Sequence, residues 1–156
     1  MLPNGLFGHL YGPIEGCHND IFALEESGLM EKCLLHAKLP EMSGDSRYFH
    51  LFGDPAYGLN NQIICPFPKQ GRSSDEQEWN TLMSKARIEV EHGFTLVTNN
   101  WPFLKAKWKH HIFQSPIGRY YRVGVLLTNA LACLRPNQVS EYFQCSPPLL
   151  NNYFHN

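Results

Sequence analysis

The longest regular pattern in this sequence runs from Ser74 or Asp75 to about Asn99–Asn100, where apolar side chains recur every three or four residues. Its members are Trp79, Leu82, Met83, Ala86, Val90, Phe94 and Val97. This spacing predicts one long amphipathic helix that begins with a Ser or Asp cap. Because such a helix must bury its apolar face, the rest of the 156 residues has to supply a core, and a hydrophobic content of 43% is enough for one.

Three shorter apolar stretches have strand character. Leu6–Tyr11 ends at a Gly-Pro turn, and Arg47–Gly53 runs directly into Asp54-Pro55. Both are expected to be strands. Ile63–Pro68 contains two prolines, which confine it to a sheet edge or a loop because proline has no N–H to donate to a ladder. The sequence therefore predicts a mixed α/β domain.

Helix signals appear on both sides of these strands. Asp20 is the expected cap of a helix that stops near Gly28 and resumes over Leu29–His36. A second long helix is expected over about Arg119–Leu134. It is apolar on most sides and is therefore expected to be buried. The residues beyond Pro136 are expected to form an irregular strap.

Charge and cysteine content limit the classes of protein. The formal net charge is −1, which gives no bulk preference for nucleic acid or membrane surfaces. Five cysteines without a Cys-x-x-Cys pair indicate reduced thiols in an intracellular protein. No apolar run approaches the roughly 18 residues of a membrane span, and no signal peptide is recognisable. A soluble intracellular domain is expected.

Two carboxylates occupy positions that suit metal-dependent chemistry. Asp54 follows a predicted strand, and Glu91 lies within the long predicted helix. Cleavage of a phosphodiester by two divalent ions needs oxygen ligands on rigid elements, and magnesium prefers such ligands. Simpler interpretations remain open. Asp before Pro commonly opens a turn, Glu91 can pair with Arg87 one helical turn earlier, and periodicity does not choose between Glu91 and Glu89.

Other candidate groups are weaker. The basic and aromatic stretch at 101–111 is either a contact for a DNA backbone or a solvated basic face whose tryptophans are in the core. His92 and the histidines at 110–111 have no spacing typical of a zinc site. Cys17 and His18 are not expected to act as nucleophile and base, because adjacent side chains on an extended chain point to opposite faces.

Four segments, taken together in this order, resemble a DDE superfamily endonuclease of the PIF/Harbinger transposase type. They are Leu2-Pro3-Asn4-Gly5-Leu6 through His18-Asn19-Asp20, Gly53-Asp54-Pro55-Ala56-Tyr57, Val90-Glu91-His92-Gly93-Phe94, and Gly124 through Leu134. The chain is similar to the C-terminal two-thirds of such a protein. The resemblance implies that residues 1–156 form a single DDE endonuclease-like domain, and we expect it to lack the upstream strand and the DNA-binding region.

The resemblance implies an RNase H-like α/β core, truncated at its N-terminal strand, with Mg²⁺ or Mn²⁺ bound at carboxylates. Asp54 and Glu91 match the second and third catalytic acids, and Asp20 matches a further family Asp that is a weaker metal candidate. The implied substrate is DNA, with Lys105, Lys107, Lys109 and Arg119 as candidate backbone contacts. The implied location is the nucleus, and such transposases commonly work with a separate Myb-like DNA-binding protein.

Asn4 is the main departure from the family pattern, because it stands where the first catalytic Asp is expected. Its amide oxygen brings no negative charge, so a site that holds two ions is expected to be weakened. The principal expectation is a metal-dependent nuclease domain with impaired cleavage. The alternatives are a non-catalytic relative that binds DNA or protein and a fragment without a stable fold. A missing strand would leave a sheet edge unpaired and favour self-association.

Overall fold

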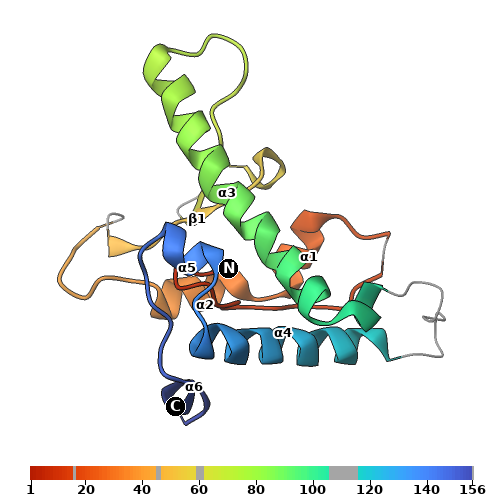
Figure 1. Cartoon of the computed structure of the whole chain (residues 1–156). Helices are drawn as coiled ribbons and strands as arrows, with labels where there is room; N and C mark the ends of the chain where they lie inside the picture. The colour runs from red at the N-terminus through yellow and green to blue at the C-terminus, as the bar shows by residue number, and fades with distance from the viewer. Residues whose placement is uncertain (16, 45–46, 59–61, 106–115, 156) are drawn as a thin grey trace. The chain divides into compact units, whose positions relative to one another are not determined.

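The computed structural model describes residues 1–15, 17–44, 47–58, 62–105 and 116–155, and the side chains of residues 89–90 lie outside the description. Two compact units divide the chain. The continuous unit consists of Tyr11–Arg87, and the discontinuous unit combines Met1–Leu10 with Ile88–Asn156. The boundary falls inside the long helix α3 (Ser74–Asn100), shown in green in Figure 1.

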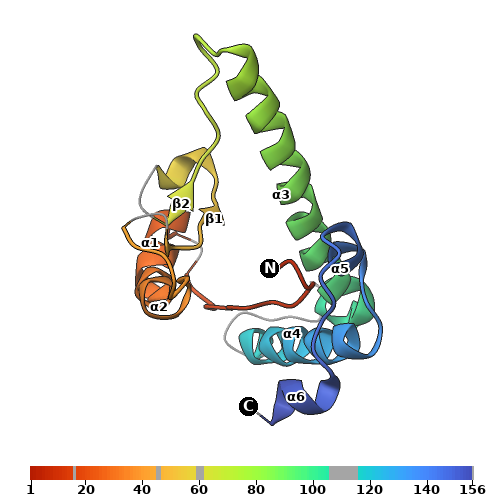
Figure 2. The same ribbon diagram turned by 90° about the vertical axis from the view of Figure 1, so that its left-hand side faces the viewer.

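The continuous unit begins with two short helices, α1 (Asp20–Glu26) and α2 (Leu29–His36). The bounds of α2 confirm the prediction. The predicted cap of α1 is wrong by one residue, because the Asn19 side chain accepts the bond from the backbone N–H of Phe22 at 2.9 Å and Asp20 is the first helical residue. Figure 2 shows both helices beside the small sheet of this unit.

The sheet consists of two strands of two residues each, β1 (Leu51–Phe52) and β2 (Ile63–Ile64). They pair in parallel, with Leu51 opposite Ile63 and Phe52 opposite Ile64. The predicted strand over 47–53 is therefore much shorter than expected. Ile63–Pro68 behaves as its prolines require, since pairing ends at Ile64. The described part of the chain is therefore helix-rich with a small sheet.

Helix α3 confirms the longest sequence pattern, and it ends at Asn100 as predicted. Its start differs slightly from the prediction. Ser73 is the capping residue: its hydroxyl accepts from the N–H of Glu76 at 3.2 Å, and the Glu76 carboxylate accepts from the N–H of Ser73 at 2.7 Å. This reciprocal pair is a capping box, which satisfies two backbone donors at the helix start.

The discontinuous unit contains the 3-10 turn η3 (Pro102–Lys105) and the helices α4 (Ile117–Leu134), α5 (Gln138–Tyr142) and α6 (Leu150–Phe154). The last two helices replace the irregular strap that was predicted. Helix α4 buries one face only, and the expectation of burial on most sides is wrong. Its exposed apolar residues are Val123, Leu126, Leu127 and Leu134.

Side-chain amides hold the N-terminal segment in the discontinuous unit. Asn129, which is 4% exposed, accepts from the N–H of Phe7 at 2.8 Å and donates to its C=O at 3.1 Å. Asn137 donates to the C=O of Gly5 at 3.0 Å. Gly5 has a φ of +78°, and a side chain there would collide with Asn137. Leu6–Tyr11 is not a strand, and at Phe7 the Asn129 amide takes the place of a sheet partner.

The structure also bears on the expectations about the cysteines and about membrane-spanning segments. All five cysteines carry free thiols, so the chain has no disulfide frame. Within the described residues, no helix combines the length and the apolar character that crossing a membrane requires.

Candidate functional site

Asp54 lies where the chain leaves β1. The N–H of Gly53 donates to the C=O of Ile64 at 3.0 Å, which extends the pairing with β2 up to the residue before Asp54. The Asp54 carboxylate then accepts from the N–H of Ala56 at 3.1 Å and caps the 3-10 turn η2 (Pro55–Tyr57). The turn-opening role of Asp before Pro is thus confirmed. It occupies only one carboxylate oxygen.

Arg87 engages the other oxygen of Asp54. The distance from the guanidinium Nη2 to Oδ2 is 3.4 Å, and the Asp54 and Arg87 side chains are 49% and 34% exposed. Sequence reasoning offered Arg87 as a partner for Glu91, whereas the structure pairs it with Asp54, 33 positions away. An ion pair this exposed contributes little to stability. Its effect is to orient the carboxylate and to place a positive charge beside it.

The pKa of Tyr57 shows which charged groups act at this turn. Burial raises the pKa of its phenol, the negative charges of Asp20 and Asp54 raise it further, and the positive charge of Arg87 opposes them. Helix α1, which begins at Asp20, packs against η2. The structure therefore brings Asp20, Asp54 and Arg87 to one aromatic ring. Sequence reasoning missed Tyr57 as a member of the site, although it lies in the quoted motif.

Cys65 holds the backbone carbonyl groups on both sides of the η2 turn. Its buried thiol lies 3.1 Å from the carbonyl oxygens of both Asp54 and Gly58, and its single hydrogen is shared between these two acceptors. Burial raises the pKa of this thiol, the charge of Asp54 raises it further and that of Arg87 opposes both, so Cys65 is held as a neutral donor. Gly53 is needed at the same place, because a Cβ there would lie 2.5 Å from Cγ2 of Ile63.

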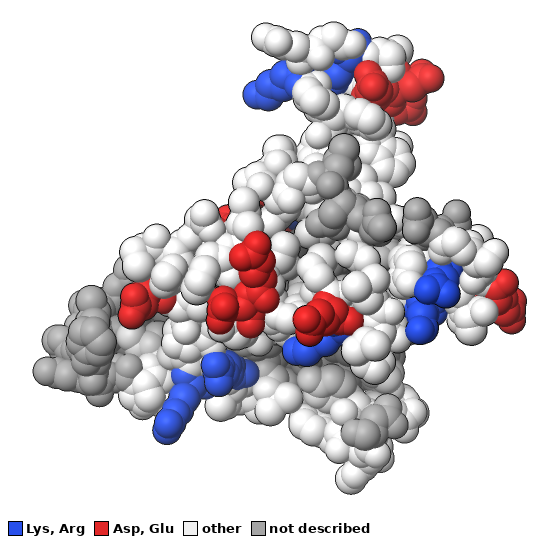
Figure 3. All heavy atoms as spheres, turned by 180° about the vertical axis from the view of Figure 1, so that it is seen from behind, with Lys and Arg blue, Asp and Glu red and all other residues white. Residues whose placement is uncertain are grey.

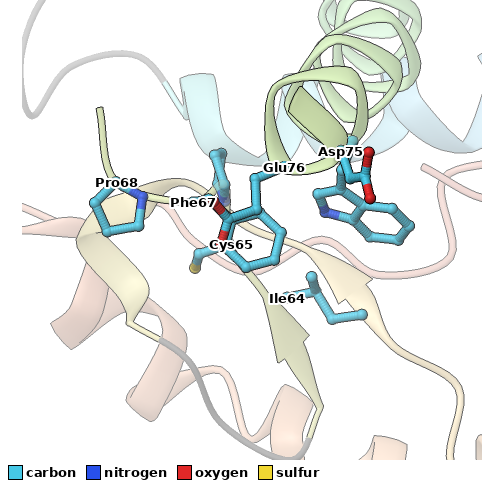
Figure 4. A pocket seen from close by; sticks show the side chains of 8 residues that line it. Ile64, Cys65, Phe67, Pro68, Asp75 and Glu76 are labelled. Atoms are coloured by element: carbon cyan, nitrogen blue, oxygen red, sulfur yellow. The ribbon is translucent and has the colours of Figure 1, made fainter. Parts of the chain in front are cut away.

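A pocket of about 380 Å³ lies beyond Cys65. Its lining residues are Ile64, Cys65, Pro66, Phe67, Pro68, Asp75, Glu76 and Trp79. Figure 4 shows Asp75 and Glu76 on the helix α3 above the apolar side chains of the β2 segment. Glu76 is already engaged in the capping box, and Cys65 donates to carbonyl groups. Both side chains are therefore already engaged, and the pocket offers a mainly apolar surface near the Asp54 turn.

Glu91 and Asn4 lie in the discontinuous unit. Glu91 is exposed on α3. Asn4 accepts from the N–H of Leu6 at 3.2 Å through its side-chain oxygen, so it forms a local turn. Their segments pack together: a side chain at Gly93 would collide with Met1, and the rings of Phe7 and Phe94 lie 6.0 Å apart between centroids. The segments of the first and third expected ligands therefore share one unit, while Asp20 and Asp54 belong to the other.

The candidate DNA contacts are only partly described. Lys105 donates to the side-chain oxygen of Asn99 at 2.6 Å, and Arg119 is exposed in the first turn of α4. Lys107 and Lys109 lie outside the described residues, as do the histidines at 110–111. On the face drawn in Figure 3, acidic and basic side chains occur in small separate groups among uncharged atoms. This pattern agrees with the net charge of −1.

The residues at the Asp54 turn suit a hard divalent cation. Asp54 is half-exposed with its outer oxygen already facing a positive group, and Asp20 is an exposed carboxylate acting on the same phenol. Oxygen donors of this kind bind Mg²⁺ or Mn²⁺. They do not form a ready-made set of three, because the cluster of three potential ligand atoms found among the described residues is Glu15, Cys17 and His18.

Comparison with known proteins identifies one family. The family model described as DDE superfamily endonuclease matches residues 1–129, which include Asn4, Asp20, Asp54 and Glu91. No curated protein matches the chain. No solved structure matches it either.

Proposed function

This chain belongs to the DDE superfamily endonuclease family, and we propose that it is a transposase-derived nuclease domain that binds divalent metal through Asp54 and Glu91. Asp20 is proposed as a further oxygen donor. The observation that carries the proposal is the Asp54 turn, in which a half-exposed carboxylate follows a parallel strand pair and is oriented by the N–H of Ala56. These are the properties of an oxygen ligand held on a rigid element.

Each group at the turn has a defined role in this proposal. Ala56 fixes one oxygen of Asp54 through its N–H, and Cys65 fixes the Asp54 carbonyl, so the carboxylate is oriented before any metal binds. Arg87 neutralises the other oxygen in the metal-free protein. Bound Mg²⁺ or Mn²⁺ would supply charge neutralisation at the attacking and leaving oxygens of a phosphodiester. Glu91, on α3, is the other proposed carboxylate ligand.

The finer assignment rests on the sequence motifs. We propose a PIF/Harbinger-type origin, a nuclear location and DNA as the substrate, with Lys105, Lys107, Lys109 and Arg119 contacting the phosphate backbone. A Myb-like protein is the proposed partner for recognising DNA ends. Among the described residues β1 and β2 pair only with each other, and we propose that the other edges of these strands can support self-association.

Asn4 makes impaired cleavage part of the proposal. Its side-chain oxygen already accepts from Leu6, and a neutral amide adds no charge to a metal site. An aspartate in its place retains an oxygen that can accept the same bond. Asn4→Asp is therefore a conservative change that adds one negative charge to the site.

The first test is calorimetric binding of Mn²⁺ to the purified chain, to Asp54→Ala and to Glu91→Ala. The matched control is Glu78→Ala, which removes another exposed carboxylate of α3 outside the family motifs. The proposal expects saturable binding that both site variants lose and the control retains. Binding of equal strength in all four proteins would refute this ligand assignment.

The second test measures nicking of supercoiled DNA with Mn²⁺. We expect Asn4→Asp to cleave faster than the unsubstituted chain, and Asn4→Asp combined with Asp54→Ala to lose that activity. If the unsubstituted chain cleaves as fast as Asn4→Asp, the impairment at Asn4 is wrong. If the double variant still cleaves, Asp54 is not a catalytic residue.

A second candidate function is a non-catalytic module that binds DNA or protein. The use of Asn4 as a turn-forming residue favours it, since this position then has a structural role without metal. Under this alternative, Asp54→Ala and Glu91→Ala bind DNA as well as the unsubstituted chain does. Lys105→Gln with Arg119→Gln weakens binding and reduces its dependence on salt. Nicking by Asn4→Asp would favour the nuclease.

A further inference from the structure

A second group of metal-ligating side chains lies just before α1, within the first segment that resembles the family, and includes none of the expected catalytic acids. Glu15, Cys17 and His18 each offer one ligand atom, and the three atoms lie within 4.8 Å of one another. All three residues are exposed. From this geometry we propose a zinc site that is separate from the acids at Asp54 and Glu91.

A turn creates the cluster. The N–H of His18 donates to the C=O of Glu15 at 3.1 Å, which closes the backbone on itself. The sequence-based argument that Cys17 and His18 point to opposite faces assumed an extended chain, and this bond shows that the assumption is wrong. In the folded turn, Cys17 Sγ lies 3.7 Å and His18 Nε2 lies 4.0 Å from the same oxygen, Oε2 of Glu15.

These distances are close to those that zinc requires. A tetrahedral zinc ion with bonds of about 2.0–2.3 Å sets its ligand atoms roughly 3.3–3.8 Å apart. The Cys17–Glu15 separation of 3.7 Å is within that range, and the His18–Glu15 separation of 4.0 Å exceeds it. The ligand atoms of Cys17 and His18 lie within 4.8 Å of each other, so the exposed side chains must rotate to bring all three atoms onto one ion.

The imidazole is held in place from the other side. The ring of His18 stacks on Phe22 with centroids 4.0 Å apart and an interplanar angle of 15°. Phe22 lies in the first turn of α1, and its N–H is bound by the Asn19 cap. The ligand nitrogen is therefore positioned by a helix, while the carboxylate and the thiol come from the preceding turn.

The chemistry of the three donors selects the metal. A thiolate, an imidazole and a carboxylate together suit Zn²⁺ and Co²⁺, whereas Mg²⁺ and Ca²⁺ take oxygen ligands. When the metal binds, the Cys17 thiol releases its proton to solvent and the sulfur forms the bond as a thiolate. Solvent supplies the fourth ligand at this exposed position. A bound ion would fasten the turn to the start of α1.

The experiment uses Co²⁺ as an optical probe on the full chain, because thiolate ligation gives a charge-transfer band. We expect one equivalent of Co²⁺ to produce the band, Zn²⁺ to remove it and Mg²⁺ to leave it unchanged. Cys17→Ser should abolish the band. His18→Gln and Glu15→Gln should each weaken affinity by at least the roughly 10–100-fold that loss of an outer-shell partner costs.

Two controls decide the outcome. Cys145→Ser removes another exposed thiol and should leave the band intact. Asp54→Ala should also leave it intact, so failure of this site and failure of the proposed nuclease site are distinguishable. The proposal is overturned if the unsubstituted chain gives no band, if the band survives Cys17→Ser, or if either control removes it. Circular dichroism of each variant confirms that it is folded.

Discussion

In the discontinuous unit the segment around Phe7 is held by neutral side-chain amides, whereas in the continuous unit the Asp54 carboxylate is held by a guanidinium group. Asn129 is buried and makes its bonds at 2.8 and 3.1 Å, while the Arg87–Asp54 pair is half-exposed at 3.4 Å. Buried neutral hydrogen bonds are costly to leave unmade, whereas exposed ion pairs are weak and screened by salt. The attachment of the Phe7 segment is thus strong, whereas the attachment of the Asp54 carboxylate is weak and can be exchanged.

The largest effect should come from removing the Asn129 side chain, whose two hydrogen bonds to the backbone of Phe7 we call the amide clamp. Asn129→Ala removes both bonds to Phe7 and the bond to the Tyr153 hydroxyl at 2.9 Å. Because the N–H and C=O of Phe7 then lose their partner, we expect the free energy of unfolding to fall by roughly 2–4 kcal/mol. Urea denaturation measures it. Asn152→Ala, an exposed amide in α6, is the control and should change stability little. A loss equal to that of the control would contradict the clamp.

A somewhat smaller loss of stability is expected when a side chain is added at Gly53 in the continuous unit. Gly53→Ala places a methyl group 2.5 Å from Cγ2 of the buried Ile63, so we expect a loss of about 1–3 kcal/mol. Leucine lacks that branch. The cost of Gly53→Ala should therefore shrink when it is measured in an Ile63→Leu background. A cost that is the same in both backgrounds would show that the contact is not its cause.

The ion pair should contribute less than either contact. Arg87→Gln is expected to lower stability by about 1 kcal/mol or less, and the difference should vanish in concentrated salt. Lys85→Gln, an exposed cation on the same helix, is the matched control. The deficit of Asn129→Ala should persist in the same salt. If concentrated salt abolished the loss of stability equally in Arg87→Gln and Asn129→Ala, the contrast between the charged pair and the neutral hydrogen bonds would be wrong.

The smallest effect concerns Tyr57. Its folded-state pKa is raised by burial and then by Asp20 and Asp54, so the neutral phenol is favoured in the native state. This contribution to stability is complete below the unfolded tyrosine pKa of about 10 and is lost as pH rises through the higher folded value. Ultraviolet titration, compared with Tyr57→Phe, isolates its signal.

Substituting a neighbouring carboxylate tests the electrostatic part of that shift. Asp54→Asn should lower the Tyr57 pKa, and Asp20→Asn should do so as well. Asp75→Asn removes an exposed acid that has no part in the Tyr57 shift, and it should leave the titration unchanged. Equal shifts in all three variants would indicate a general charge effect.

Local signals in the sequence predicted the regular elements well. Periodicity predicted the end of α3 and both bounds of α2, and the prolines after Ile64 predicted where pairing stops. Caps were misplaced by one or two residues, because neighbouring Asn, Asp and Ser residues have similar preferences. The apolar and aromatic run over 6–11 predicted a strand, yet this segment is not one, and the Asn129 side chain bonds both the N–H and the C=O of Phe7 without a sheet.

The site was predictable only in part. Asp54 carries a local signal in its Gly-Asp-Pro context, and its turn is confirmed. Asp54 pairs with Arg87, and Asp20 acts on Tyr57. No periodic pattern in the sequence connects the residues of either pair. The Glu15–Cys17–His18 cluster was missed because the sequence did not reveal the backbone bond that folds the turn. Long-range partners of this kind follow from packing and not from propensity.

The amide clamp also sets an order of assembly on the ribosome. Asn129 emerges 122 residues after Phe7, which at about 5–20 residues per second is a delay of roughly 6–24 seconds. During that interval residues 11–87 can complete their own contacts, while the first ten residues lack the side chains that satisfy their backbone. A nascent chain stalled before Asn129 should therefore protect the continuous unit from proteases and leave its N-terminal segment open to cleavage or chaperone capture.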